Sequence, residues 1–510
     1  MNTAADLQQE VVQLKAQLEQ KSERLQQRES YIRQLEEYLK QLRQKPFTPS
    51  SEKTSPDQFG LFNEAEDTEQ NAETESADAS ETVTIEAHQR RRRPRVSLPD
   101  HLPREERIHD LPEAEKVCPH DGTALKAIGS EDSEQLEFIP AQLKVLVHKR
   151  LKYACPCCEQ HLATADKPRQ PIEKGQAGPG LLAAIATQKY CDALPLYRQS
   201  QLFERMGIAL DRTNLANWML RCGDLAQPLI NLLHERLLAQ PVVHMDETPL
   251  QVLNEPGKTA QSQSYMWVQA SAGEQPVRLF HYAATRAQAV PLERLSEQVP
   301  VLMADGYEGY AKACRDYGIV RLGCWAHARR KFMDAKKLQP KGKTGKADQA
   351  LALIQKLYRI EQETREQPPD ERHRIRQKQA GPVIEKLQRW LEKSLPHVPP
   401  KTVLGKALAY LHQQWPRLVG YLDDGRYPID NNLAENAIRP FAIGRKNWLF
   451  ANSQAGARAS ANLYSLIETA KTNGLNPYRY LVRVFTDLPN AQTVEHIEAL
   501  LPWRATPSAE

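Results

Sequence analysis

The 510-residue sequence lacks a long apolar run, a secretory leader and a cysteine framework. No run reaches the roughly 18 apolar residues that a membrane helix requires, so we expect no membrane partner. The first residues, MNTAADLQQE, contain neither a basic nor an apolar segment, so we expect no export and a cytoplasmic location. Eight cysteines are too few for a disulfide scaffold in so long a chain, and clustered cysteines in a reducing compartment indicate metal binding.

Basic residues are also missing from one internal segment. Residues 54–89 contain no Lys or Arg, whereas acidic residues accumulate there. We therefore predict that residues 46–112 form a disordered acidic linker followed by a basic arm. The arm consists of Arg90, Arg91, Arg92, Arg93 and Arg95. It is either a solvated charge run or a DNA-binding arm, and this uneven charge favours a nucleic-acid partner more than the net charge of +4 does.

Residues 1–45 have a heptad pattern. Apolar residues at two heptad positions continue for about five heptads. They are Leu7, Val11, Leu14, Leu18, Leu25, Ile32, Leu35, Leu39 and Leu42. Lys21 and Arg28 interrupt the pattern and should weaken its middle. We predict a leucine-zipper-like coiled coil that forms a homodimer or a higher homo-oligomer; the alternative is one amphipathic helix packed against its own protein.

Cysteines cluster in residues 113–165. Two of them have the two-residue gap that lets two thiolates reach one tetrahedral zinc ion. The same gap counted from an earlier cysteine reaches an aspartate, with a histidine beside it. The predicted zinc ligands are Cys118, Asp121, Cys155 and Cys158, with His120 as the alternative to Asp121. The other interpretation is a small β-hairpin module without metal.

Residues 180–238 are predicted to be helical and have the spacing of a helix-turn-helix. One helix should end near Met206, Gly207 should form the turn, and Asp211 or Thr213 should cap the next helix. Helix pairs joined by a glycine turn are also common packing units. This region is therefore either a helix pair that reads a DNA groove or a helix pair that only packs within the protein.

Two short apolar runs end in carboxylates. PVVHMDETPL ends its run at Asp246 and Glu247, and VLMADGY ends its run at Asp305. Carboxylates are costly to bury unless they are paired or bind a cation. The predicted order from residue 241 is three strands, a helix, a strand, a helix and a strand. That order is typical of a ribonuclease-H-like domain, in which the first and fourth strands are neighbours.

Longer motifs carry a family resemblance. VHMDET, ADGYEGY, CWAHARRKF, NNLAENAIRP, GRKNWLFANS and YSLIETAKTNGLNPYRYL resemble the insertion sequence 66 family of bacterial transposases, in its large catalytic subunit. The resemblance runs nearly end to end and implies a multidomain α+β protein. Besides the coiled coil and the zinc module, it implies a ribonuclease-H-like catalytic domain at 175–455, with a helical insertion at 335–425, and a helical C-terminal domain at 460–505.

The resemblance also implies an Asp-Asp-Glu catalytic site made of Asp246, Asp305 and Glu435. These carboxylates would hold two Mg²⁺ ions roughly 3.5–4 Å apart for metal-dependent phosphoryl transfer. The expected function is that of a DNA transposase, cleaving and transferring strands at the ends of an insertion sequence. The alternatives are a catalytically inactive DNA-binding regulator and a ribonuclease-H-like nuclease without joining activity.

Further residues of these motifs are expected to contact DNA. They are His327, Arg329, Arg330, Arg439, Arg445 and Lys446, in addition to the arginine arm. The alternative for Arg329 and Arg330 is that they are ordinary surface charges. Glu247 is either a group that supports the metal ligands or an exposed carboxylate. The expected partners are the terminal repeats of the element, target DNA, further copies of the chain and small accessory proteins of the same element. A location at the nucleoid follows from this set of partners.

Overall fold

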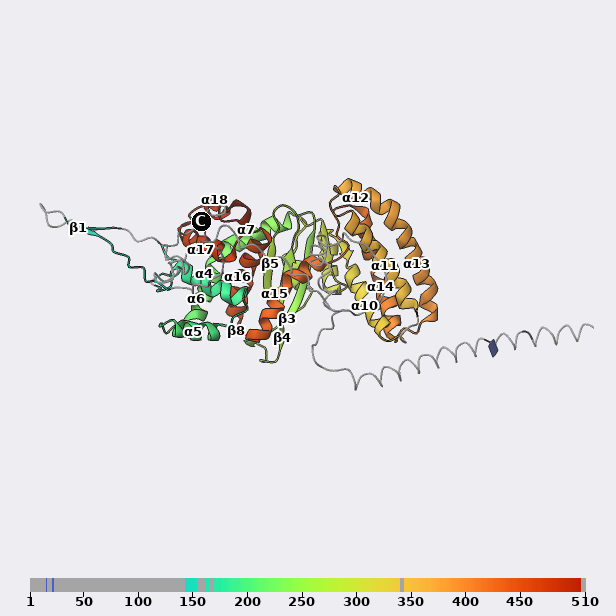
Figure 1. Ribbon diagram of the computed structural model, residues 1–510, viewed down its shortest axis with the longest axis horizontal. Helices are drawn as coiled ribbons and strands as arrows, with labels where there is room; N and C mark the ends of the chain where they lie inside the picture. Colours follow the sequence, from blue (N-terminus) through green and yellow to red (C-terminus); the bar gives the residue numbers. More distant parts are fainter. Residues whose placement is uncertain are drawn as a thin grey trace, which may run out of the picture. The chain divides into compact units, whose positions relative to one another are not determined.

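The computed structural model describes residues 15, 21–22, 143–154, 162–165, 169–173, 175–339 and 344–505 (Figure 1). The chain divides into one unit made of Met1–Gln58 and Lys152–Glu510 and a second unit, Phe59–Leu151. In the second unit the described residues are exposed and belong to no helix or strand. The predicted zinc ligands, the acidic linker and the arginine arm lie outside the described residues. Within the predicted coiled coil only residues 15, 21 and 22 are described, and they are helical.

A short antiparallel hairpin precedes the helices and the main sheet of the larger unit in the chain. It pairs β1 (Lys152–Ala154) with β2 (Leu162–Thr164). Cys155 and Cys158 belong to the connection between these strands, which lies outside the described residues. The hairpin therefore flanks the second pair of predicted zinc ligands, and it says nothing about the metal itself.

A six-stranded mixed sheet forms the centre of the larger unit. Its order is β5-β4-β3-β6-β7, and β8 pairs with β3. The strands are β3 (Val243–Asn254), β4 (Gln263–Ala270), β5 (Arg278–Ala283), β6 (Val301–Ala304), β7 (Val320–Gly323) and β8 (Ala451–Ser453). β3, β4 and β5 are antiparallel, whereas β3, β6 and β7 are parallel. The predicted pairing of the first and fourth of these strands is confirmed by the pairing of β3 with β6.

Helices cover both faces of this sheet. On one face lie α15 (Asn432–Trp448) and α16 (Gln454–Thr472), whose aromatic rings pack on Phe280 of β5. Phe280 pairs with Val268, and successive residues of a strand point to opposite faces, so Trp267 belongs to the other face. There its ring meets Tyr310 edge to face at 6.0 Å. The helices near this second face are α8 (Ala289–Arg294), η4 (Glu308–Tyr310) and α9 (Ala311–Tyr317).

The region before the sheet is helical, as predicted. It contains α4 (Pro179–Tyr190), α5 (Leu196–Arg205), α6 (Arg212–Leu225) and α7 (Gln227–Leu238). Gly207 adopts a φ of +86° in the turn after α5, and the side chain of Asp211 caps α6 by accepting a hydrogen bond from Thr213 N. Gly223 allows α6 to approach α16, because a Cβ there would lie 2.6 Å from Ala459 Cα. A role in reading DNA stays a prediction.

The residues between β7 and α15 form helices with a hydrophobic core of their own (Figure 1). The elements are α10 (Trp325–Lys337), α11 (Lys346–Glu363), α12 (Pro369–Ile375), η5 (Arg376–Ala380), α13 (Gly381–Ser394), η6 (Leu395–His397), α14 (Val403–Val419) and η7 (Gly420–Asp423). Trp325 at the start of α10 and Trp415 in α14 pack edge to face at 6.3 Å. This core joins the helices that follow β7 into one packed layer.

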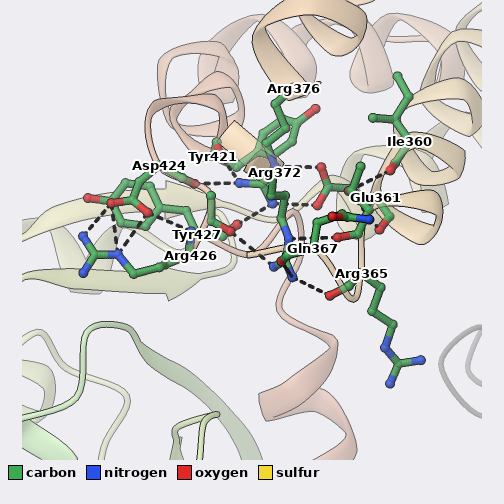
Figure 2. Close-up of polar contacts among 12 residues, drawn as sticks. Ile360, Glu361, Arg365, Gln367, Arg372, Arg376, Tyr421, Asp424, Arg426 and Tyr427 are labelled. Atoms are coloured by element: carbon green, nitrogen blue, oxygen red, sulfur yellow. Dashed lines mark hydrogen bonds and ion pairs between the residues drawn. The ribbon is translucent and has the colours of Figure 1, made fainter. Parts of the chain in front are cut away.

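A buried arginine ties these helices to the loop that leads toward α15 (Figure 2). Arg376 donates to both carboxylate oxygens of Glu361, at 2.9 and 2.6 Å. It also donates to the carbonyls of Tyr421 and Asp424, each at 2.7 Å, and of Tyr427 at 2.9 Å. One fully buried guanidinium therefore fixes α11 and three carbonyls of the loop at the same time.

The described C-terminal part is helical. After α16 come α17 (Pro477–Asp487), η8 (Leu488–Asn490), α18 (Val494–Glu498) and η9 (Pro502–Arg504). The predicted domain boundary at residues 455–460 falls inside α16, which is continuous from the sheet region. The predicted mixed α+β class is confirmed. No helix in the described ranges has the length and apolar character needed to span a membrane.

Candidate active site at the edge of β3 and β6

Asp246 and Asp305 are brought together by the register of two parallel strands. His244 of β3 pairs with Met303 of β6. Each aspartate follows its paired residue by two positions, and neighbouring strands lie about 4.8 Å apart. The two predicted carboxylates therefore lie beside each other, one within β3 and the other directly after β6.

Glu435 reaches the same place from the first turn of α15. The start of this helix is fixed by Asn431, which is fully buried. The Asn431 side chain donates to the carbonyl of Met245 at 2.9 Å, and its oxygen lies 3.0 Å from His244 Nδ1. Its backbone N–H donates to Cys324 Sγ at 3.2 Å. Asn431 thus holds the beginning of α15 against β3, next to Asp246.

The residue before Asn431 caps α15. The Asn431 side chain makes no capping hydrogen bond, because it is committed to β3. Asp430 takes that role and accepts a hydrogen bond from Asn432 N at 3.1 Å. Asp430 also accepts from the Tyr358 hydroxyl at 2.9 Å, so α11 contributes to the position of this helix end.

The carboxylates create a strongly negative environment. Burial raises the pKa of Asp246 well above its usual value, and the charges of Glu247, Glu435 and Asp305 raise it further. One partner opposes this shift, because the Asp246 carboxylate accepts a hydrogen bond from Glu247 N at 2.9 Å. Asp305 similarly accepts from Tyr307 N at 2.9 Å. Four acidic groups therefore interact here with too little neighbouring positive charge to offset their repulsion at Asp246.

Glu247 is a buried carboxylate that accepts hydrogen bonds from two side chains. Its side chain is only 1% exposed. The Tyr310 hydroxyl donates to it at 2.6 Å and Arg286 Nε at 2.5 Å. Arg286 also stacks over the Tyr307 ring, 4.0 Å from its centre. Glu247 is thus buried rather than exposed, and it links β3 to the residues that follow Asp305.

Glu435 contacts two of the residues predicted to bind DNA. Arg330 of α10 donates to its Oε2 at 3.0 Å, and His327 Nδ1 lies 3.4 Å from its Oε1. Burial lowers the pKa of His327, while the charge of Glu435 opposes that shift. Ligand atoms of Cys324, His327 and Glu435 all lie within 4.8 Å of one another. Burial raises the pKa of the Cys324 thiol, so this sulfur is a poor ligand for a cation that prefers oxygen.

The other described basic residues lie on the same elements. Arg329 is in α10, and Arg439, Arg445 and Lys446 are in α15. Arg445 donates to Thr248 Oγ1 at 3.3 Å, so it sits against β3 two residues beyond Asp246. Their proposed contact with DNA is not tested by this arrangement.

Two features of the site were not expected from the sequence. Arg286 follows β5 and has no motif that marks it as a partner of Glu247. Arg321 in β7 donates to the carbonyls of Asp305 and Tyr307 at 2.8 and 2.7 Å, which fixes the turn after β6. These contacts join residues that are 14 to 39 positions apart in the sequence, and no local sequence pattern indicates them.

Replacing Asn431 with Ala is expected to lower the free energy of unfolding by about 2–4 kcal/mol, because it leaves the Met245 carbonyl and the His244 ring without their buried partner. Urea unfolding followed by tryptophan fluorescence measures this loss. Asn447→Ala is the matched control, since Asn447 is an exposed residue of the same helix that donates to Ala193 O. Equal unfolding midpoints for the two variants would contradict the role given to Asn431.

Comparison with known proteins identifies the class of the chain and then its family. A model described as "Transposase IS66 family" matches residues 174–459, more than half of the chain. Models described as "IS66 C-terminal element" and "zinc-finger binding domain of transposase IS66" match residues 465–503 and 115–159. One described as "Transposase C of IS166 homeodomain" matches 34–107. The chain is a transposase by these matches, and it belongs to the insertion sequence 66 (IS66) family.

Relatives in Sinorhizobium fredii extend over most of the chain. Uncharacterized protein y4jD is 34% identical over 421 residues, which cover 80% of this chain and 81% of that protein. Uncharacterized protein y4qI is 33% identical over 430 residues, which cover 82% and 78%. These relatives support the family membership, and their names assign no activity.

Proposed function

We propose that this protein is a DDE-type transposase that cleaves DNA strands at the ends of an insertion sequence and transfers them to target DNA. The observation that carries this proposal is the meeting of Asp246, Asp305 and Glu435 at the edge of β3 and β6. Family membership supports the same reaction class.

The sheet supports assignment of residues 175–455 to a ribonuclease-H-like catalytic domain. Three antiparallel strands are followed by two parallel ones, in the order β5-β4-β3-β6-β7. The first and fourth strands carry the two aspartates, and a helix beyond the fifth strand carries the glutamate. The helices between β7 and α15 then correspond to the predicted insertion at 335–425.

The acidic side chains fit Mg²⁺ by their chemistry. Carboxylate oxygens are the ligands that this hard cation prefers. Burial and the neighbouring carboxylates raise the pKa of Asp246, a shift that a bound cation would oppose. Glu435 Oε1 is buried without a hydrogen bond from any described residue. Asp246, Asp305 and Glu435 would hold the ions. When bound, two Mg²⁺ ions stabilise the attacking and leaving oxygens of an in-line phosphoryl transfer.

The surrounding residues position these carboxylates. Asn431 holds the start of α15 against β3, and Arg330 orients Glu435 through Oε2. Arg321 fixes the turn that presents Asp305. Burial favours the neutral form of His327, which can then donate or accept one hydrogen bond near the scissile phosphate without adding a fixed charge.

DNA is the proposed partner throughout. The basic residues of α10 and α15 and the arginine arm would contact its phosphates, with a salt-dependent affinity. The coiled coil at 1–45 would join the chains that act on the two element ends, and accessory proteins of the element complete the proposed set. Because its proposed partner is DNA, the protein is proposed to act at the nucleoid in the cytoplasm.

A strand-transfer assay tests this function. Purified full-length protein is incubated with Mg²⁺, a labelled duplex carrying an element end and a target plasmid. Cleavage that leaves a free 3′-hydroxyl, followed by a joined product, is the expected result. Binding without cleavage would favour the inactive regulator, and cleavage without joining would favour the nuclease.

The zinc module is a second proposal, supported by the match of residues 115–159 to a zinc-finger model. One zinc ion per chain is expected, held by Cys118, Cys155, Cys158 and either Asp121 or His120. Cys155→Ser should release this zinc and unfold the module locally, because metal binding and folding are coupled in such small sites. Elemental analysis of the purified protein gives the zinc content. Cys157→Ser is the control, and full zinc content in both variants would refute the ligand set.

A further inference from the structure

A cavity of about 480 Å³ lies along the outer edge of β5, apart from the carboxylate site. Residues of α7, α8 and α16 form its other walls. β5 is an edge strand of the sheet, so its outward backbone groups have no neighbouring strand. The cavity is therefore bounded on one side by a main chain that can still form hydrogen bonds.

Side chains of α16 accept hydrogen bonds from some of the outward N–H groups of β5. Thr469 Oγ1 accepts from Arg278 N at 3.1 Å, and Ser465 Oγ accepts from Phe280 N at 2.7 Å. Outward N–H groups recur at every second residue of a strand, so the next one belongs to Tyr282. Tyr282 lines the cavity, and its hydroxyl is engaged elsewhere with Glu255. A main-chain donor is thus directed toward the cavity.

The charge of the cavity is positive. Arg458 of α16 lines it, is exposed, and makes no hydrogen bond or ion pair with any described residue. Arg294 lines it as well, and its buried Nε has no acceptor among the described residues. Glu293 is the only acidic residue in the described lining, and it is 68% exposed and bound to Arg294 at 3.2 Å. A cationic group therefore remains available to an anion.

The pKa of a histidine in the cavity is consistent with the positive charge of the lining. Burial, together with the charges of Arg294, His234 and Arg458, lowers the pKa of His281 to about 3. At neutral pH the His281 ring is uncharged and can donate one hydrogen bond. An arginine without a partner, a neutral histidine and a main-chain N–H together match the oxygens of a phosphate group.

The cavity is close to the carboxylate site along the sheet. Glu247 pairs with Trp267, and Trp267 pairs with His281, so His281 is two strands from Glu247, on the face opposite to Asp246. Asp246 pairs with Val268, and Val268 pairs with Phe280, which also lines the cavity two strands away. Two strand spacings correspond to about 10 Å. Thr285 lines the cavity, and the next residue, Arg286, bonds to Glu247 beside Asp246. A strand of DNA at the carboxylates would therefore pass within reach of the cavity.

We propose that this cavity is a phosphate-binding subsite, which holds the backbone of the DNA strand a short distance from the bond that is cut. Arg458 supplies the cationic contact, and His281 and Tyr282 N–H supply neutral donors. This inference rests on the proposed function, since it takes DNA as the source of the phosphate. A free nucleotide has the same chemistry and is distinguished by the experiment.

Salt-dependent DNA binding of full-length Arg458→Gln tests the subsite, because it needs no cleavage. Fluorescence anisotropy with an end-labelled duplex should show about five-fold to ten-fold weaker binding at low salt. The slope of log affinity against log salt should fall by about one, as expected for one lost phosphate contact. Arg458→Lys should keep most of the slope. Arg479→Gln, which removes an exposed arginine of α17 outside the cavity, should leave both quantities unchanged.

Further measurements separate this proposal from the proposed function. The same titrations with Asp246→Asn in the background should give the same loss of slope, even when cleavage is absent. An unchanged slope in Arg458→Gln overturns the subsite, whether or not the protein cleaves DNA. Calorimetry with a deoxynucleoside monophosphate completes the test. If Arg458→Gln loses nucleotide binding and keeps the DNA slope, the cavity takes a free nucleotide, and the DNA assignment is overturned.

Discussion

Asp246→Asn is expected to lower the rate of DNA strand cleavage by on the order of a thousand-fold or more, which corresponds to about 4 kcal/mol of transition-state stabilisation. The substitution removes the charge of a proposed metal ligand at nearly constant volume. Asp305→Asn and Glu435→Gln should have effects of the same order. Single-turnover cleavage of a labelled end duplex in Mg²⁺ measures the rate, and anisotropy with the same duplex measures binding, which should be largely retained.

Asp316→Asn is the matched control for these substitutions. Asp316 is a partly exposed aspartate of α9 that pairs with Lys312, away from the site. It should cleave at the rate of the unsubstituted protein. Full activity in any of the three site variants would remove that residue from the catalytic set.

Stability offers a second, independent readout for Asp246→Asn. The folded-state pKa of Asp246 is raised, so the folded protein binds this proton more tightly than the unfolded chain does. Stability therefore falls as the pH rises from the unfolded pKa of about 3.9 toward the raised value. At neutral pH and without metal, removal of the charge should raise the melting temperature by a few degrees, while activity is lost. A lower melting temperature would indicate damaged folding instead of a missing ligand.

The positions of the two aspartates could be predicted because both signals are local. Each stands at the end of a short apolar run, and the order of the predicted strands makes the first and fourth neighbours. The structure gives this pairing through His244 and Met303. A carboxylate that directly follows an apolar run is costly to bury unless it is paired or binds a cation, and that requirement can be read from the sequence alone. In the structure β3 continues past Asp246 to Asn254.

Residues that hold the site in place could not be predicted in the same way. Asn431 stands directly before α15, and its side chain bonds to Met245, which is 186 residues away in the sequence. Arg330 was expected to grip phosphate, and in the structure it donates to Glu435. Each of these roles depends on which distant backbone comes close, and composition and periodicity do not contain that information.

The largest expected effect on stability belongs to Arg376. Arg376→Met should lower the free energy of unfolding by about 3–5 kcal/mol, the range for a buried ion pair that loses one partner. Its guanidinium has no exposed surface. The substitution leaves the Glu361 carboxylate without its bidentate partner and the carbonyls of Tyr421, Asp424 and Tyr427 without their donor. Urea unfolding followed by tryptophan fluorescence gives the change.

A matched surface pair provides the control for this loss. Arg374 donates to Glu371 with two bonds of 2.9 and 2.7 Å, which resemble those of Arg376 with Glu361, but the Arg374 side chain is 76% exposed. Water screens such a pair, so Arg374→Met should leave the unfolding midpoint unchanged. The double variant Arg376→Met/Glu361→Leu should recover part of the loss, because it also removes the unpaired carboxylate.

The contacts of Arg376 should also affect the rate of catalysis. The loop that Arg376 holds leads directly to the start of α15, the helix that carries Glu435. Tyr427 lies three residues before Asp430, and Asp430 is held by Tyr358 of the same helix, α11, that supplies Glu361. Release of the loop should therefore let the start of α15 move. Because α15 carries Glu435, Arg376→Met should slow Mg²⁺-dependent cleavage even at temperatures where the protein is fully folded. Limited proteolysis should find new cuts at residues 421–430 in this variant. Wild-type cleavage rates with the loop released would show that β3 and Asn431 are sufficient to hold Glu435.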